Sequence, residues 1–293
     1  MRSLREPYSE RGDEFVGELL EECAANFTKR ADRRERLLGC RQAVVDFSRE
    51  YRAGMPRNIE SVRRTAESTP FPADDLEHVY TEKIARPNAV GRKYYDHILN
   101  AGKEQGTCPI CETGVVKELD HYLPKSRYPG LAITPANLIP LCSDCNRVGG
   151  KGGYSPTTYE ETLFHPYFEE PPSYVWLRAD LLLEDTPIAV YGVEKLPDVV
   201  MRHRFERFLE VYDLGERYGA LAVGVFGPAR TWCEKLLNKG GVEDLRNYFV
   251  ERCDVAEADN LNSWQSALYR AAVRQVVEIA GKLGGQGSFA NLS

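Results

Sequence analysis

The sequence predicts an α+β fold, namely a mainly helical chain whose small central region of short strands is stapled by a four-cysteine zinc site. Apolar residues recur at helical spacing in residues 13–53 and again from residue 199 onward. The central stretch 106–153 is instead rich in Gly, Pro and short apolar runs, and its prolines exclude a long helix. That stretch contains two Cys-x-x-Cys pairs, Cys108–Cys111 and Cys142–Cys145.

The breaks in these patterns predict three regions. Residues 1–102 form a helical N-terminal region, residues 103–170 form the central core, and residues 171–293 form a mainly helical C-terminal region. Within the core we expect a strand over 118–123, a second strand over 138–141, and a helix that begins near Cys145. The core therefore has the order strand, loop, strand, helix.

Composition indicates an ordinary soluble globular protein, with 42% hydrophobic and 28% charged residues among 293. No apolar run approaches the roughly 18 residues that cross a membrane, so we expect no membrane contact. The first residues lack the apolar segment of a secretory signal. The four unpaired cysteines are expected to be reduced, which predicts a cytoplasmic protein; they are Cys23, Cys40, Cys233 and Cys253.

The two cysteine pairs predict one tetrahedral zinc ion, because a two-residue gap lets both thiolates of a pair reach the same ion. Four thiolates close the coordination sphere, so this zinc is structural and leaves no position for a reactive water. The polar residues between the pairs therefore need another explanation, and catalysis on a phosphodiester is the best one. They are Asp120, His121, Lys125, Arg127 and Asn137.

Asp120, His121 and Asn146 are suitable for metal-assisted hydrolysis. A carboxylate and an amide oxygen are hard ligands of the kind that Mg²⁺ prefers. An imidazole can take a proton from water at physiological pH. Neighbouring strand residues point to opposite faces, so we expect a distorted strand end to bring Asp120 and His121 to one ion.

These residues resemble the HNH endonucleases, in the zinc-stapled subgroup with two Cys-x-x-Cys pairs. The resemblance is carried by Asp120-His121-Tyr-Leu-Pro, by Asn137-Leu-Ile-Pro-Leu-Cys and by Cys145-Asn146-Arg. Asn137 and Asn146 follow His121 by 16 and 25 residues, close to the family spacing, which makes this an H-N-N variant.

The resemblance implies a ββα-metal fold that cuts DNA with Mg²⁺ or Mn²⁺. His121 would be the general base, Asp120 and Asn146 would hold the cation, and Asn137 would order the loop and orient His121. The cations near the phosphates would be Lys125, Arg127, Arg147 and Lys151. Lys151 is shifted by two residues from the usual Asn-x-x-Lys-Gly register.

Flanking segments resemble bacterial HNH proteins of anti-phage defence. They include Phe164-His165-Pro-Tyr-Phe168 and Asn262-Ser-Trp264. The resemblance implies a defence role, beside an ATPase or another regulatory subunit as in Septu-type systems. The chain has no Gly-x-x-x-x-Gly-Lys-Ser/Thr motif, so a partner would supply any ATP hydrolysis.

Each candidate residue has a competing structural role. Asn146 could be the N-cap of the following helix, and Asp120 could cap a turn. Lys125 and Arg127 could be solvated loop charges. His165 lies among aromatic residues, which favours a packed histidine over a place near the active site.

Two other functions could also account for the cysteine pairs. A non-catalytic zinc ribbon that binds nucleic acid or protein needs only the thiolates, and it is the alternative. A zinc-dependent base deaminase requires His-x-Glu, and each of the five histidines lacks it.

Charge is unevenly distributed in this chain of net charge −6. Residues 29–64 contain eleven Lys or Arg and five acidic residues. This balance indicates either a nucleic-acid footprint or a solvated helix face.

Overall fold

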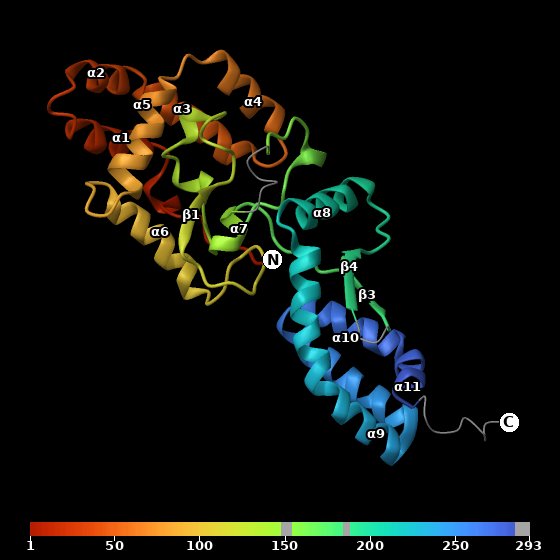
Figure 1. Ribbon diagram of the computed structural model, residues 1–293. Coiled ribbons are helices and arrows are strands. Elements are labelled where there is room, and N and C mark those ends of the chain that lie inside the picture. The colour runs from red at the N-terminus through yellow and green to blue at the C-terminus, as the bar shows by residue number, and fades with distance from the viewer. Residues whose placement is uncertain (148–153, 184–187, 285–293) are drawn as a thin grey trace. The chain divides into compact units, whose positions relative to one another are not determined.

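The computed structural model describes residues 1–147, 154–183 and 188–284, and it divides into two compact units, Met1–Pro171 and Pro172–Ser293 (Figure 1). Both units are mainly helical and each contains one two-stranded antiparallel sheet, which confirms the α+β prediction. Lys151 lies outside the described residues. In the parts of the chain that the structure describes, no helix has both the length and the apolar character needed to cross a membrane.

The first unit begins with helices that precede the hairpin. The region 13–53, which apolar spacing predicts as helical, is divided among three helices. The elements are η1 (Ser9–Arg11), α1 (Phe15–Ala25), α2 (Ala31–Gly39), α3 (Arg41–Gly54), α4 (Ile59–Ser68), α5 (Ala73–His78), η2 (Val79–Ala85, a π-helix) and α6 (Arg92–Glu104).

One hydrophobic core joins these helices to the strands. Leu20 of α1 and Val44 of α3 are fully buried, and the same cluster includes Leu119 and Leu138 of the hairpin. Full burial of such a side chain contributes about 1.5–3 kcal/mol. The core therefore fixes the strands on the helical layer.

The hairpin consists of β1 (Glu118–His121) and β2 (Leu138–Leu141). The loop between them contains η3 (Pro129–Leu131) and η4 (Pro135–Asn137), and α7 (Ser143–Arg147) follows β2. The bounds of β2 are those predicted, whereas β1 ends two residues before the predicted end. Leu123 leaves the ladder because its N–H bonds to the Asn137 side chain. Helix α7 begins two residues before Cys145.

Pro140 is tolerated inside β2 because of the register. It lies opposite Leu119, whose N–H donates to the Tyr95 hydroxyl at 3.1 Å and so points away from β2. The missing proline N–H therefore costs the ladder no hydrogen bond.

The second unit packs helices around the hairpin of β3 (Leu177–Leu182) and β4 (Ile188–Val193). Strands are expected over 174–177 and 188–191; β4 covers the second, while β3 begins only at the last residue of the first. The helices are α8 (Val199–Val211), α9 (Leu214–Asp259), α10 (Trp264–Arg274) and α11 (Val276–Gly284). Gly241, at φ 71°, breaks α9 into two helices.

We predict that Gly102→Ala destabilises the first unit by about 1–3 kcal/mol, because a methyl group there overpacks a rigid neighbour. A Cβ at Gly102 of α6 would lie 2.4 Å from Cβ of Pro140. Urea denaturation measures the change. The matched control is Gly39→Ala in α2, where nothing lies within 4 Å. We expect that control to be neutral or stabilising by up to about 1 kcal/mol, and equal effects at both sites would refute the close contact of α6 with β2.

Candidate zinc centre and active site

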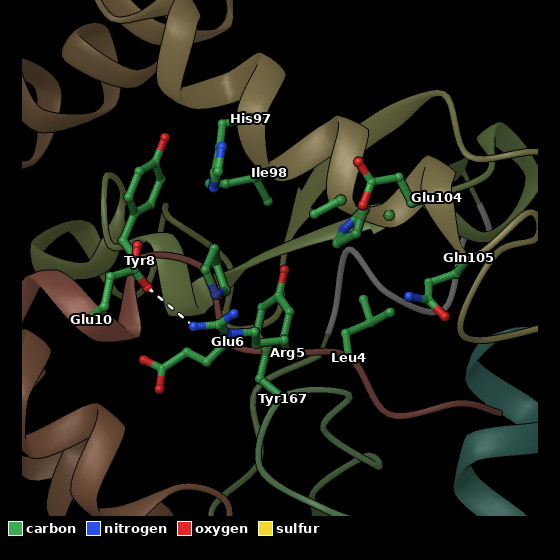
Figure 2. Close-up of a pocket in the computed structure, with 14 residues that line it drawn as sticks. Leu4, Arg5, Glu6, Tyr8, Glu10, His97, Ile98, Glu104, Gln105 and Tyr167 are labelled. Atoms are coloured by element: carbon green, nitrogen blue, oxygen red, sulfur yellow. Dashed lines mark ion pairs between the residues drawn. The ribbon is translucent and has the colours of Figure 1, made fainter.

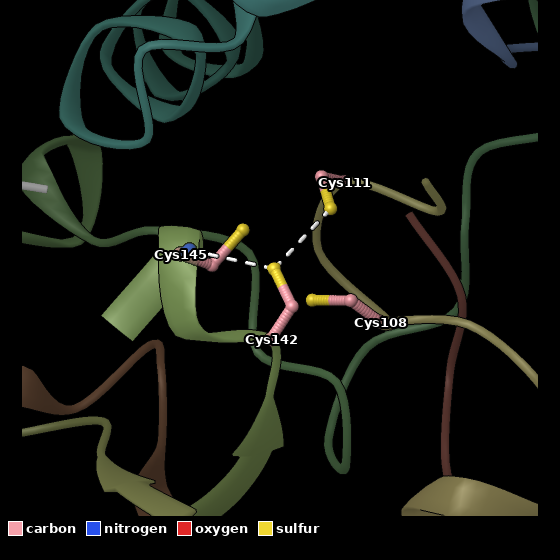
Figure 3. Close-up of side chains that lie close together, drawn as sticks. All are labelled: Cys108, Cys111, Cys142 and Cys145. Atoms are coloured by element: carbon pink, nitrogen blue, oxygen red, sulfur yellow. Dashed lines mark hydrogen bonds between the residues drawn. The ribbon is translucent and has the colours of Figure 1, made fainter. Parts of the chain in front are cut away.

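The four cysteines of the two pairs meet in one buried cluster (Figure 3). Their sulfur atoms all lie within 4.8 Å of one another, and Sγ of Cys111 is 3.7 Å from Sγ of Cys142. Among the residues that the structure describes, this is the one group of three or more His, Cys, Asp or Glu that could hold a metal ion. Four converging thiols fit tetrahedral zinc, as the sequence predicts.

Local backbone geometry positions the thiols. The N–H groups of Gly114 and Cys145 point at the sulfurs of Cys111 and Cys142, at 3.4 Å each. Gly114 allows the two loops to approach, because a Cβ there would lie 2.6 Å from Cβ of Cys142. Hydrogen bonding with Cys108 leads the causes that lower the pKa of Cys142, whereas hydrogen bonding with Cys111 leads those that raise the pKa of Cys108. Zinc would hold all four cysteines as thiolates.

Alternation along β1 separates its side chains into two sets. Leu119 and His121 are buried, whereas Glu118 and Asp120 are half-buried on the other face. His121 is still paired with Leu138 of β2, and its backbone N–H donates to Asp120 Oδ1 at 2.8 Å. Asp120 and His121 therefore lie at the end of a regular paired strand rather than in the distorted strand end that we expect from the sequence.

The ring of His121 is held by groups far away in the sequence. Its Nε2 lies 2.8 Å from the carbonyl oxygen of Ala132, and Tyr80 packs against the ring at 4.4 Å between centroids. A carbonyl can only accept a hydrogen bond, so Nε2 carries the proton and donates. In the neutral ring, the lone pair then resides on Nδ1.

Asn137 is fully buried at the end of the loop between the strands. Its Oδ1 accepts from the Leu123 N–H at 2.8 Å, and its Nδ2 donates to the carbonyls of Leu123 and Leu131 at 3.0 and 3.3 Å. Leu131 is the neighbour of Ala132, so the asparagine side chain ties together both ends of the segment that contacts His121.

Asn146 lies inside α7, and its own N–H bonds to the Cys142 carbonyl at 3.1 Å. It is therefore not the N-cap of this helix. Its side-chain Nδ2 donates to Glu118 of β1, whose carboxylate also accepts from the Ser143 hydroxyl at 2.7 Å. These hydrogen bonds, from Ser143 first and then from Asn146, lower the pKa of Glu118.

Glu118 is a site residue that the sequence analysis missed. The sequence does indicate that Glu118 lies near Asp120. Residues i and i+2 of a strand share a face, and Glu118 precedes Asp120 by two positions. The structure brings Asn146 to the strand of Asp120 and His121 through this carboxylate.

The predicted phosphate-contacting cations differ in their surroundings. Lys125 pairs with Glu77 of α5 at 3.4 Å and is partly buried. Arg127 is exposed, and Arg147 is exposed with a 3.4 Å contact to Glu118.

His165 is a packed histidine, as the sequence favours. It is completely buried, its Nε2 lies 2.9 Å from the Tyr51 hydroxyl, and its Nδ1 accepts from the Tyr167 N–H at 3.2 Å. Its ring stacks on Phe168.

A cavity of about 380 Å³ lies elsewhere in the first unit (Figure 2). It is lined by the N-terminal segment, by the end of α6 and by Pro140, and an ion pair between Arg5 and Glu10 crosses one side. The predicted site residues are not among its lining residues. The candidate active site is therefore at the edge of the hairpin and not in this cavity.

Comparison with known proteins identifies the central region. Residues 108–151 match the family model described as HNH endonuclease. The chain is 30% identical to Protein ea31 of Escherichia phage lambda over 149 residues, which are 49% of either chain. It is 28% identical to the Septu protein PtuB of Bacillus thuringiensis over 99 residues, 32% of this chain and 37% of the relative. The chain thus spans half or less of the length of these relatives. No solved structure matches it.

We predict that Cys108→Ser lowers the zinc content from about one ion per chain toward zero and destabilises the first unit, because metal binding supplies folding free energy. Elemental analysis and thermal denaturation measure both effects. Cys40→Ser is the control, since Cys40 is half-buried outside the cluster and donates to the Leu37 carbonyl. A Cys108→Ser protein with unchanged stability and no zinc would contradict the structural role.

Proposed function

From the premise that residues 108–151 form an HNH endonuclease domain, we propose that the chain is a metal-dependent endonuclease that hydrolyses DNA phosphodiester bonds. His121 is the general base, Asp120 and Asn146 hold Mg²⁺ or Mn²⁺, and the four cysteines hold a structural zinc ion. Asn137 orders the loop that orients His121.

The observation that carries this proposal is the hydrogen bond between His121 Nε2 and the Ala132 carbonyl. It fixes the tautomer in which Nδ1 is basic. His121 Nδ1 takes a proton from water, the water oxygen bonds to phosphorus, and the bond from phosphorus to the leaving sugar oxygen breaks. General-base assistance of this kind typically contributes 10²–10⁴-fold in rate.

The donor set is consistent with a hard cation. A carboxylate from Asp120 and an amide oxygen from Asn146 are oxygen ligands, unlike the thiolates of the zinc cluster. A bound Mg²⁺ or Mn²⁺ would neutralise the phosphate and stabilise the leaving oxygen.

The helical regions 1–102 and 171–293 flank the nuclease core 103–170, and in this proposal they set target choice or bind a regulator. Within the basic segment 29–64, most arginines are neutralised by ion pairs, as Arg36 is with Asp75 and Asp32. Within the described part of the chain, the exposed cations of the segment that form no ion pair are Lys29, Arg30, Arg34, Arg57 and Arg64. Of these, Arg57 lies over the ring of Tyr159, at 4.9 Å from its centroid. The DNA footprint is assigned to these exposed cations, together with the active-site cations Lys125, Arg127, Arg147 and Lys151.

A role in anti-phage defence is part of the proposal. It is supported by the resemblance of the flanking segments and by the similarity to a Septu protein. Because the chain lacks an ATP-binding motif, an ATPase or another regulatory subunit would be a separate partner. The location we propose is cytoplasmic.

We predict that His121→Ala lowers the rate of plasmid nicking in Mg²⁺ by about 10²–10⁴-fold while the zinc content is retained. Gel assays of supercoiled and linear DNA, with and without EDTA, measure the rate. His203→Ala in α8 is the control, since that residue is exposed in the second unit. Equal cutting by both variants would refute His121 as the base, and a wild-type protein that binds DNA without cutting it would favour a non-catalytic zinc ribbon.

We predict that replacing Lys29, Arg30 and Arg34 together with Gln weakens DNA binding. The slope of log affinity against log salt should fall by about 0.9 for each lost phosphate contact. Fluorescence anisotropy at several salt concentrations gives the slope. Arg36→Gln is the control, because Arg36 lies in α2 like Arg34 but is bound to two carboxylates. An unchanged slope in the triple variant would identify these residues as solvated charges.

A further inference from the structure

We propose that Glu118 is a positioning residue that orients the Asn146 amide so that its oxygen, and not its nitrogen, is presented to the catalytic cation. This inference rests on the proposed function, in which Asn146 is a cation ligand. Glu118 is not one of the HNH motif residues, so this inference adds a residue to the site.

The chemistry of the two groups determines the orientation. An asparagine amide has a donating nitrogen and an accepting oxygen, and the two can exchange places by a rotation of the side chain. Only the oxygen can bind a cation. An ionised carboxylate can only accept, so Glu118 selects the rotamer in which Nδ2 of Asn146 faces it. The Oδ1 atom is then on the side of the amide that faces away from Glu118.

Glu118 is itself held rigidly enough to select one rotamer. Its other carboxylate oxygen accepts from the Ser143 hydroxyl at 2.7 Å and lies 3.4 Å from Arg147. Its backbone pairs with Leu141 at the end of β2. The carboxylate is thus fixed from β1, β2 and the first turn of α7, and 29% of the Glu118 side chain remains exposed.

The position of Glu118 is also consistent with a hydrogen-bond acceptor that orients the Asn146 amide. It shares the half-buried face of β1 with Asp120, the proposed carboxylate ligand. Outer-shell groups that orient metal ligands typically change metal affinity by 10–100-fold when they are removed. We expect removal of the Glu118 carboxylate to lower the affinity for the cation by a similar factor.

The test is calorimetric titration of Mn²⁺ alone into the full-length, zinc-loaded protein, without DNA. Glu118→Ala should weaken Mn²⁺ binding about ten- to hundredfold, because the amide is free to rotate. Glu118→Gln should stay within about threefold of wild type, since its amide oxygen can accept from Asn146 while its amide nitrogen donates to Ser143. Zinc content and melting temperature, measured in parallel, report whether each variant is folded.

A double-mutant cycle separates positioning from direct ligation. If Glu118 acts through Asn146, the double variant Glu118→Ala/Asn146→Ala binds Mn²⁺ no more weakly than Asn146→Ala. Additive losses, or a loss in Glu118→Gln as large as in Glu118→Ala, would overturn the proposal and make Glu118 a ligand. Asp144→Ala, which removes an exposed carboxylate from the same helix, controls for charge and should change the affinity by no more than about threefold.

The outcome is independent of the nuclease assignment. A wild-type protein that fails to cut DNA would refute the proposed function, yet the Mn²⁺ titrations would still be measurable. Unchanged affinity in Glu118→Ala beside a loss in Asn146→Ala would refute the positioning role alone. Unchanged affinity in Asn146→Ala would remove the ligand on which Glu118 is proposed to act, and it would overturn the inference.

Discussion

The convergence of four thiols is the constraint on which the central region depends. One pair of cysteines lies between α6 and β1, and the other lies after β2 and in α7, so a metal ion at the cluster would hold the start of β1 and the end of β2 together. Each strand of that hairpin has only four residues. An isolated hairpin of this size is at best marginally stable, and it needs such a clamp together with the helical core behind it. The remaining polar residues can then be positioned by a small, stiff scaffold.

This scaffold determines the geometry of the candidate active site. Asn146 is the residue after Cys145, so the clamp places it beside Glu118 of β1. His121 is oriented from the opposite side, by a backbone carbonyl in a loop that Asn137 ties down. His121, the proposed base, and Asp120, a proposed oxygen ligand, thus lie on different faces of β1. This separation is consistent with two tasks, one for proton transfer and one for the cation.

Much of the site could be predicted because its signals are local. The cysteine spacing predicts the cluster, and the apolar run at residues 138–141 predicts β2 with its observed bounds. The contacts that orient the site were not predictable. Tyr80 reaches His121 from 41 positions away, and nothing in the local pattern of either residue indicates it. The charge balance of residues 29–64 likewise does not indicate which of its cations are neutralised, because ion-pair partners such as Asp75 lie outside that segment.

The most direct measurement is a crystal structure of the protein grown with Mn²⁺, with anomalous data collected at the zinc and manganese edges. The account predicts two separate ions. Zinc should lie about 2.3 Å from the sulfur atoms of the four cysteines, and manganese should be coordinated by oxygen atoms of Asp120 and Asn146. A manganese ion bound without these two side chains, or an absence of zinc at the thiolates, would contradict the central claim.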